Sequence, residues 1–144
     1  DTGTTTATPL GVFMGCSFTN PVTKQKMFSQ SWPASTVAPD AQAIVCDDPD
    51  ALFKVACVSG TTVIAGYSYA SLVGKNVSLV QNAVNTTTGD SKVAVLGSSA
   101  ATTNTLPIRV IDVVRETADA SGNFTEVIVK INAGMHQYNN ATGA

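Results

Sequence analysis

The sequence has few of the side chains that carry chemistry. Its 144 residues include one histidine (His136) and three cysteines, and only 12% are charged, about half of the usual share of roughly 25%. General acid–base and metal catalysis depend on imidazole, thiolate or closely spaced carboxylates. The patterns GxSxG and HExxH are missing, as is a complete phosphate loop. We therefore expect no enzyme, no catalytic or metal site and no cofactor.

The distribution of charged and apolar residues argues against two classes of partner. The net charge is −2, and eight Lys and Arg residues are scattered between Lys24 and Lys130, whereas nucleic-acid binding needs a clustered basic face. No apolar run approaches the ~20 residues of a membrane-spanning helix. We expect neither nucleic acid nor a membrane as a partner.

The three cysteines, Cys16, Cys46 and Cys57, each lie in an apolar stretch without a CxxC pattern or a nearby histidine. This setting favours reduced, buried thiols that pack as small apolar side chains. A Cys46–Cys57 bridge is the alternative that the sequence leaves open.

What the sequence does contain is a β pattern. Short segments in which Val, Ile, Thr and aromatic residues recur at every second position are separated by Gly, Pro, Asn and Asp, which is typical of strands and turns. The strands are predicted at Gly11–Phe18, Lys26–Trp32, Gln42–Asp47, Phe53–Ser59, Thr61–Ala65, Val77–Gln81, Lys92–Leu96, Leu106–Arg115 and Phe124–Asn132. They predict an all-β fold, a single antiparallel sandwich or barrel.

The last two segments form the clearest pair. Thr125, Val127, Val129 and Ile131 present one face, and polar residues between them present the other, as in a half-buried strand. We expect this segment and Leu106–Arg115 to form a long hairpin.

At most two short helical turns are expected. Asp48–Phe53 begins like a helix, with proline after a capping aspartate, but its continuation favours a turn into a strand. Tyr69–Lys75 is the second candidate. Residues 1–9 hold five threonines and no large apolar side chain, so we interpret them as a flexible arm on a domain of residues 10–144.

The sequence offers one acidic cluster and one histidine as candidate functional residues, and it favours structural roles for both. Asp47, Asp48 and Asp50 could offer oxygen ligands to Ca²⁺, but the spacing of a calcium loop is missing, and a solvated turn fits better. His136 lacks a recognisable nucleophile motif, which favours a histidine that hydrogen-bonds the terminal segment.

Phe28 and Trp32 concentrate large apolar area in one segment. A tryptophan of this kind can anchor an interface or stack on a sugar, although a place in the core fits the usual burial of tryptophan. Four Asn-X-Ser/Thr sequons, beginning at Asn76, Asn85, Asn123 and Asn140, follow from a composition rich in these residues.

An ordered series of segments resembles a known family. The segments are Leu10–Pro21 (LGVFMGCSFTNP), Phe28–Pro33 (FSQSWP), Asp47–Val55 (DDPDALFKV), Val73–Asn76 (VGKN), Thr105–Ile111 (TLPIRVI) and Val127–Asn132 (VIVKIN) through His136–Tyr138 (HQY). Together they look like virion structural proteins of tailed bacteriophages, of the head decoration or capsid cement type.

The resemblance implies a β-rich protein made in the bacterial cytoplasm and carried on the capsid exterior. Its partner would be the major capsid protein, whose subunit contacts it would reinforce, and it would self-associate, often as a trimer. The resemblance implies neither enzyme activity nor a cofactor.

We expect the contact residues to lie in the arm and in the tryptophan segment. A Thr-rich arm could order on binding as an added strand. The candidate interface residues are Thr2, Thr4, Thr5, Thr6, Thr8, Phe28 and Trp32.

Two other functions remain open at this point. One is a carbohydrate-binding β-sandwich adhesion module that uses Trp32 with tyrosines such as Tyr67, Tyr69 and Tyr138 as stacking platforms. The other is a tail-tube or connector subunit that assembles into rings.

Overall fold

The computed structural model describes residues 7–59, 62–63, 69–85, 87–117 and 125–141, and it confirms the all-β fold. One sheet contains β1 (Val12–Thr19), β2 (Lys26–Ser29) and β3 (Gln42–Cys46). The other contains β4 (Phe53–Ser59), β5 (Thr62–Val63), β6 (Asn76–Gln81), β7 (Val93–Ala101), β8 (Ile108–Val113) and β9 (Glu126–Ile131). One helical turn, α1 (Tyr69–Leu72), precedes β6.

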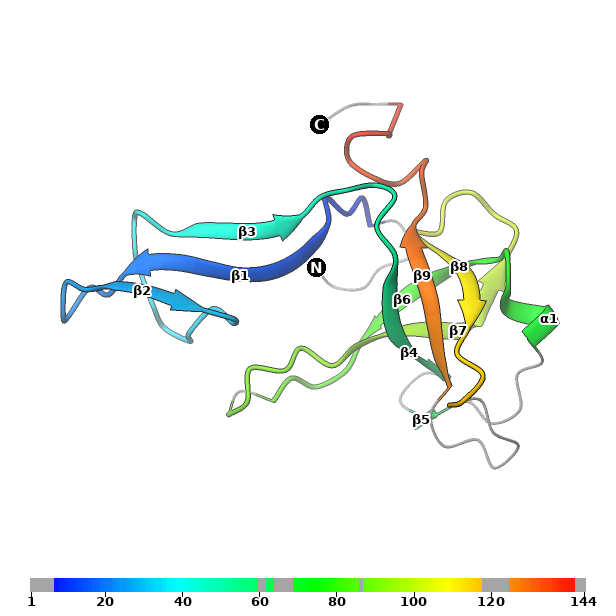
Figure 1. Ribbon diagram of the computed structural model, residues 1–144, viewed down its shortest axis with the longest axis horizontal. Coiled ribbons are helices and arrows are strands. Elements are labelled where there is room, and N and C mark those ends of the chain that lie inside the picture. The colour runs from blue at the N-terminus through cyan, green and yellow to red at the C-terminus, as the bar shows by residue number, and fades with distance from the viewer. Residues whose placement is uncertain (1–6, 60–61, 64–68, 86, 118–124, 142–144) are drawn as a thin grey trace.

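The larger sheet closes into a barrel because β4 has partners on both sides. Its strand order is β5-β4-β7-β6-β8-β9, and β4 also pairs with β9. The first half of β4 runs antiparallel to β9, while Cys57 and Val58 pair in parallel with Val95 and Leu96 of β7. The sequence predicted an antiparallel sheet, so it did not predict this parallel pair. β4 and β7 lie side by side in the barrel (Figure 1).

The barrel core is built from the alternating residues of its strands. In β9, Val127, Val129 and Ile131 are buried, whereas Glu126 and Lys130 are half-buried on the other face. The core as a whole contains Cys57, Leu72, Val77, Val95, Ile108, Val110, Val113, Val127, Val129 and Ile131. Burial of this contiguous apolar surface is the main force that holds the barrel together.

A bulge interrupts the alternation in β8. Val110 lies opposite Val129, but Asp112 lies opposite Ile128, so Ile111 is an extra residue. The extra residue changes which positions face the core, and Val113 is buried where strict alternation would have turned it outward.

The three-stranded sheet projects from the barrel (Figure 1). It is antiparallel throughout, with β1 between β2 and β3. A bulge at Met14 lies between Phe13 and Gly15 of β1. Gly15 has φ of 149°, and a Cβ there would approach the Ser29 carbonyl oxygen to 2.9 Å, so glycine suits both the conformation and the close strand approach.

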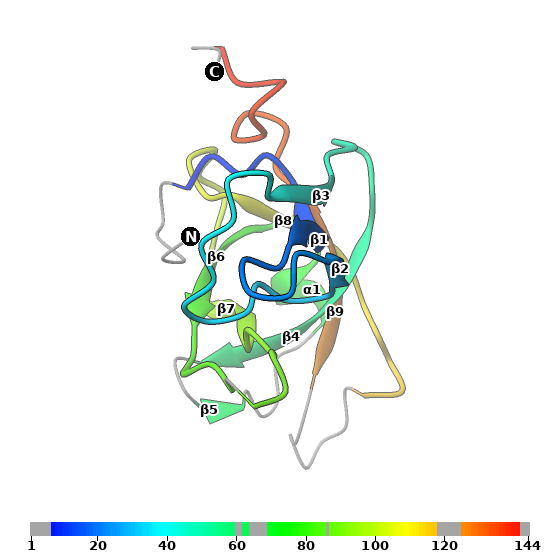
Figure 2. The ribbon, with the colours of Figure 1, turned by 90° about the vertical axis from the view of Figure 1, so that its left-hand side faces the viewer.

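The two faces of this sheet differ in their surroundings. Residues directly opposite each other in a sheet share a face, which places Phe28 with Ser17, and Ile44 with Gly15, on one side. Phe18 points to the other side, where its ring lies 5.2 Å from that of Trp32. Figure 2 views the projecting sheet from its far end.

The segments at residues 9–11 and 137–138 help to join the projecting sheet to the barrel. At its base, Gly11 lies so close to the Cys46 carbonyl that a Cβ would not fit. The Gln137 amide donates to the Pro9 carbonyl at 3.1 Å, and Tyr138 donates its hydroxyl hydrogen to Asp47 at 2.9 Å.

The described residues confirm most of the expected elements. Each predicted strand corresponds to an observed one, and the last two strands pair as predicted. The strand predicted at Lys26–Trp32 ends at Ser29, so Trp32 lies outside it, and β7 continues to Ala101. Parts of the strands predicted at Thr61–Ala65 and Phe124–Asn132 lie outside the described residues. The segment from Asp48 turns into β4, and the helical turn is limited to Tyr69–Leu72. Residues 1–6 of the expected arm lie outside the described residues, whereas Ala7 is buried and Pro9 bonds to the C-terminal segment.

Candidate binding surfaces

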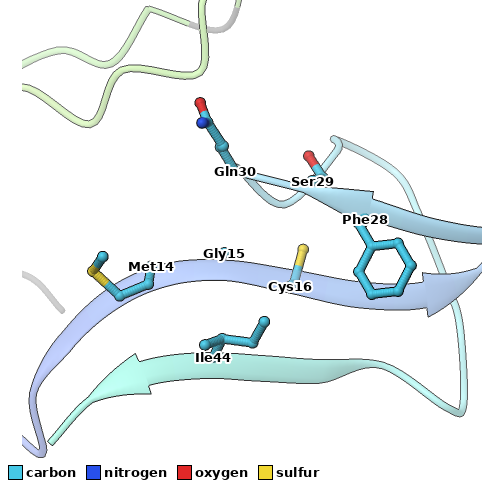
Figure 3. A pocket seen from close by; sticks show the side chains of 7 residues that line it. All are labelled: Met14, Gly15, Cys16, Phe28, Ser29, Gln30 and Ile44. Carbon is cyan, nitrogen blue, oxygen red and sulfur yellow. The ribbon is translucent and has the colours of Figure 1, made fainter.

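The projecting sheet carries a cluster of exposed apolar side chains, here named the Met14 patch: Met14, Phe28 and Ile44. Their exposed fractions are 60%, 75% and 55%. The three side chains border a shallow hollow above Gly15, where β1 has no side chain to fill the space (Figure 3). Large apolar side chains gathered on one face, without a covering layer, are typical of a binding surface.

The core role that the sequence favours for Trp32 is only partly right, and Phe28 is exposed. The Phe28 side chain lies on the face shared with Ile44, and 75% of its surface is exposed. Trp32 keeps 44% of its surface exposed, although its ring packs against Phe18. The reason is architectural, because three strands without a second layer cannot enclose large rings on both faces.

The threonines proposed as interface residues fall mostly outside the described part of the chain. Thr2, Thr4, Thr5 and Thr6 are not among the described residues, and Thr8 is exposed. The structure brings Phe28 together with Met14 and Ile44. Trp32 lines a different cleft, which shares only Gln30 with the hollow beside these three residues.

That cleft lies between the projecting sheet and the connection from β6 to β7. It has a volume of about 800 Å³. Its two walls include Phe13, Gln30 and Trp32 on one side and Asn85, Thr88 and Asp90 on the other. Aromatic and amide groups thus face one another across an open space, as is common in small-molecule sites.

The wall formed by the β6–β7 connection is held by its own hydrogen bonds. The Asn85 amide donates to the Asp90 carbonyl at 3.0 Å, and the Gly89 amide donates to the Asn85 carbonyl at 2.8 Å. Thr88 donates its hydroxyl hydrogen to the Asp90 carboxylate at 2.6 Å. A Cβ on Gly89 would come within 2.6 Å of the Ser31 hydroxyl oxygen, so the loop rests directly on the sheet.

His136 is fully buried and has the structural role that the sequence favours. Its Nδ1 accepts a hydrogen bond from the Tyr138 amide at 3.2 Å, and its own amide donates to Asn132. Its Nε2 is buried with no hydrogen-bond partner among the described residues. Asn132 also donates to the carbonyls of Asn104 and Leu106, so this segment closes one end of the barrel.

The acidic cluster is divided among separate contacts. Asp48 caps its own turn by accepting from the Asp50 amide at 2.9 Å, and Lys130 lies 3.1 Å from Asp50. Asp47 accepts from Tyr138, and this hydrogen bond, followed by the negative charge, raises the pKa of the phenol. Within the described ranges, no three His, Cys, Asp or Glu side chains are arranged to hold a metal ion.

All three cysteines are free thiols, so the alternative of a Cys46–Cys57 bridge is wrong. Cys16 and Cys57 are buried, and burial raises the pKa of the Cys57 thiol. A neutral, buried thiol is a poor nucleophile, which agrees with the packing role expected from the sequence.

Two features were not recognised from the sequence. Asp40 fastens the far end of the projecting sheet, where its carboxylate accepts from the Thr19 hydroxyl at 2.7 Å and the Thr19 amide at 3.0 Å. These bonds, with Lys26 nearby, lower its pKa to about 2.

The second feature is Asn76, which begins one of the sequons. Its side chain is buried and hydrogen-bonds to Thr103 and Arg109. Both features depend on residues distant in sequence.

Comparisons with family models, curated proteins and solved structures return no match. Among the described residues, none of the helices has the length and apolar character needed to cross a bilayer.

Proposed function

We propose that this protein is a virion structural protein that binds the outer surface of a phage capsid and stabilises contacts between major capsid protein subunits. The proposal rests on the family resemblance of the sequence and on one structural observation. That observation is the Met14 patch, an apolar surface carried away from the barrel on a projecting sheet.

The position of the patch suits a protein that reaches across a boundary between subunits. The barrel has its own core, so the exposed Met14, Phe28 and Ile44 are not needed to complete it. Apolar side chains gathered in this way are stabilised when a second protein excludes water from them. Many identical copies bound in this manner would stabilise a shell by mass action.

The open edge of β3 is a candidate for self-association. Among the described elements, β3 pairs only with β1, and Gln42–Cys46 contains neither a charge nor a proline. The opposite edge, β2, is four residues long and carries Lys26, which is a feature that discourages pairing with another chain. We propose that the protein self-associates through the β3 edge.

The direct test is co-sedimentation of the purified protein with capsids of the phage that carries the gene, stripped of this protein. We expect saturable binding and a raised capsid disruption temperature. Capsids that neither bind the protein nor gain thermal stability would contradict the proposal. Sizing chromatography of the free protein separates a monomer or trimer from the rings expected of a tail-tube subunit.

A further inference from the structure

The cleft between the projecting sheet and the β6–β7 connection has the chemistry of a second binding site. It lies on the side of the sheet that carries Phe18, away from Phe28 and Ile44. Gln30 is the one residue that lines both the cleft and the hollow of the Met14 patch. A ligand held by the other residues of the cleft would leave the proposed capsid contact accessible.

The aromatic part of the cleft is fixed in place. The Trp32 ring packs against Phe18 at 5.2 Å with an interplanar angle of 58°, and 44% of its surface stays exposed. Phe13, on the same wall, is 45% exposed. An aromatic ring that is supported on one side and open on the other can pack against the C–H face of a pyranose.

The polar part of the cleft lies on the facing wall. Asp90 contributes a carboxylate, Asn85 an amide, and Thr88 a hydroxyl, and Gln30 adds an exposed amide beside Trp32. Sugar hydroxyls both donate and accept hydrogen bonds, so a mixture of amide and carboxylate groups suits them.

The two walls are held in position before any ligand arrives. Gly89 has φ of 79° and lies too close to Ser31 to admit a Cβ. The backbone bonds between Asn85 and Asp90 fix the turn that contains it. Preorganisation of this kind lowers the entropic cost of binding.

The charge of the lining decides which sugars fit. Asp90 is negative, and no Lys, Arg or His is among the described residues that line the cleft. An anionic ligand would meet an uncompensated carboxylate. We propose that the cleft binds neutral carbohydrate, with a pyranose ring stacked on Trp32 and its hydroxyls bonded to Gln30, Asn85 and Asp90.

The tryptophan fluorescence of the protein reports on this cleft alone, because Trp32 is the single tryptophan in the chain. A glycan array spanning neutral hexoses, deoxyhexoses and N-acetylhexosamines identifies the neutral sugars that bind. The best of them, titrated as a soluble trisaccharide, should shift or quench the Trp32 fluorescence saturably. A trisaccharide of galacturonic acid, which is anionic, should not.

Substitutions of lining residues test whether the sugar binds in the cleft. Gln30→Ala and Asp90→Ala should each weaken affinity by roughly threefold to tenfold, as expected for one lost hydrogen bond. Gln25→Ala is the matched control, because Gln25 is also exposed but lies in the connection between β1 and β2, outside the cleft. Trp32→Phe, measured by calorimetry, should retain weaker binding, and near-native circular dichroism confirms that each variant folds.

Three results would overturn the inference. They are the absence of any neutral glycan binding on the array, binding that Gln30→Ala and Asp90→Ala leave unchanged, and a preference for the anionic trisaccharide. Asp90 and Trp32 lie outside the hollow of the Met14 patch. Capsid co-sedimentation of Asp90→Ala and Trp32→Phe should therefore match that of the unaltered protein, so failure of the glycan site is distinguishable from failure of the capsid contact.

Discussion

At the scale of single residues, a few buried or bridging side chains connect segments that are far apart in the chain. His136 and Asn132 close the barrel end, Tyr138 bonds to the base of the projecting sheet, and Asp40 fastens its far end. The only histidine thus has a structural position, and its importance can be measured as stability.

We predict that His136→Ala lowers the free energy of unfolding by about 2–4 kcal/mol, because it empties a fully buried site and removes an acceptor for the Tyr138 amide. Tyr138→Phe is the control. It removes only an exposed hydroxyl bond to Asp47 and should cost about 1 kcal/mol or less. Urea unfolding measures both values, and equal losses would refute the structural role assigned to His136.

Asp40 makes the stability of the projecting sheet depend on pH in the acidic range. Its pKa in the folded protein is about 2, below the ordinary 3.8, so the ionised carboxylate stabilises the fold above pH 3.8. That stabilisation is lost as the pH falls toward 2. An NMR titration of the Thr19 amide should show a midpoint near pH 2.

Thr19→Val provides the comparison for Asp40, because the Thr19 hydroxyl bond is the largest cause of the lowered pKa. In this variant the titration of the Asp40 side-chain carbon should move back toward 3.8. A midpoint of 3.8 in the unaltered protein would show that the contact does not form in solution.

At the scale of elements, the sequence predicts strands well and their partners poorly. Alternation in β9 identifies its buried face because the pattern is local. The bulges at Met14 and Ile111, the parallel pairing of β4 with β7, and the contact of Gly89 with Ser31 depend on distant residues. Local periodicity carries no information on these features.

The candidate sites were harder to predict for the same reason. Phe28 and Trp32 stood out as large apolar residues, but whether they are buried depends on what covers their sheet. Met14 and Ile44 join Phe28 only because β1 lies between β2 and β3. Asn85 and Asp90 approach Trp32 only through the fold of the β6–β7 connection.

Gly15 tests the geometry of the projecting sheet. Gly15→Ala should destabilise the β1–β2 pairing by about 1–3 kcal/mol, because alanine disfavours φ of 149° and its Cβ would meet the Ser29 carbonyl at 2.9 Å. Amide hydrogen exchange of β2 should accelerate. Gly134→Ala, where a Cβ meets nothing within 4 Å, should change neither exchange nor stability, and identical behaviour of the two variants would contradict the described strand approach.

At the scale of the whole molecule, the barrel provides the stable core and the projecting sheet provides the exposed surfaces proposed for binding. The barrel supplies a closed core, and the sheet carries the exposed Met14 patch and one wall of the cleft. This division allows changes on the sheet surface to alter binding without unfolding the barrel. It also makes the proposed capsid contact separable from overall stability.

The most direct measurement is the capsid occupancy of a Met14→Ser, Phe28→Ser, Ile44→Ser variant compared with Leu52→Ser. Leu52 is 59% exposed but lies between the acidic turn and β4, outside the patch. Loss of three apolar contacts at an interface should weaken binding by at least about 100-fold, whereas Leu52→Ser should bind as the unaltered protein does. Unchanged occupancy of the triple variant, with its fold intact by circular dichroism, would contradict the assignment of the Met14 patch as the capsid contact.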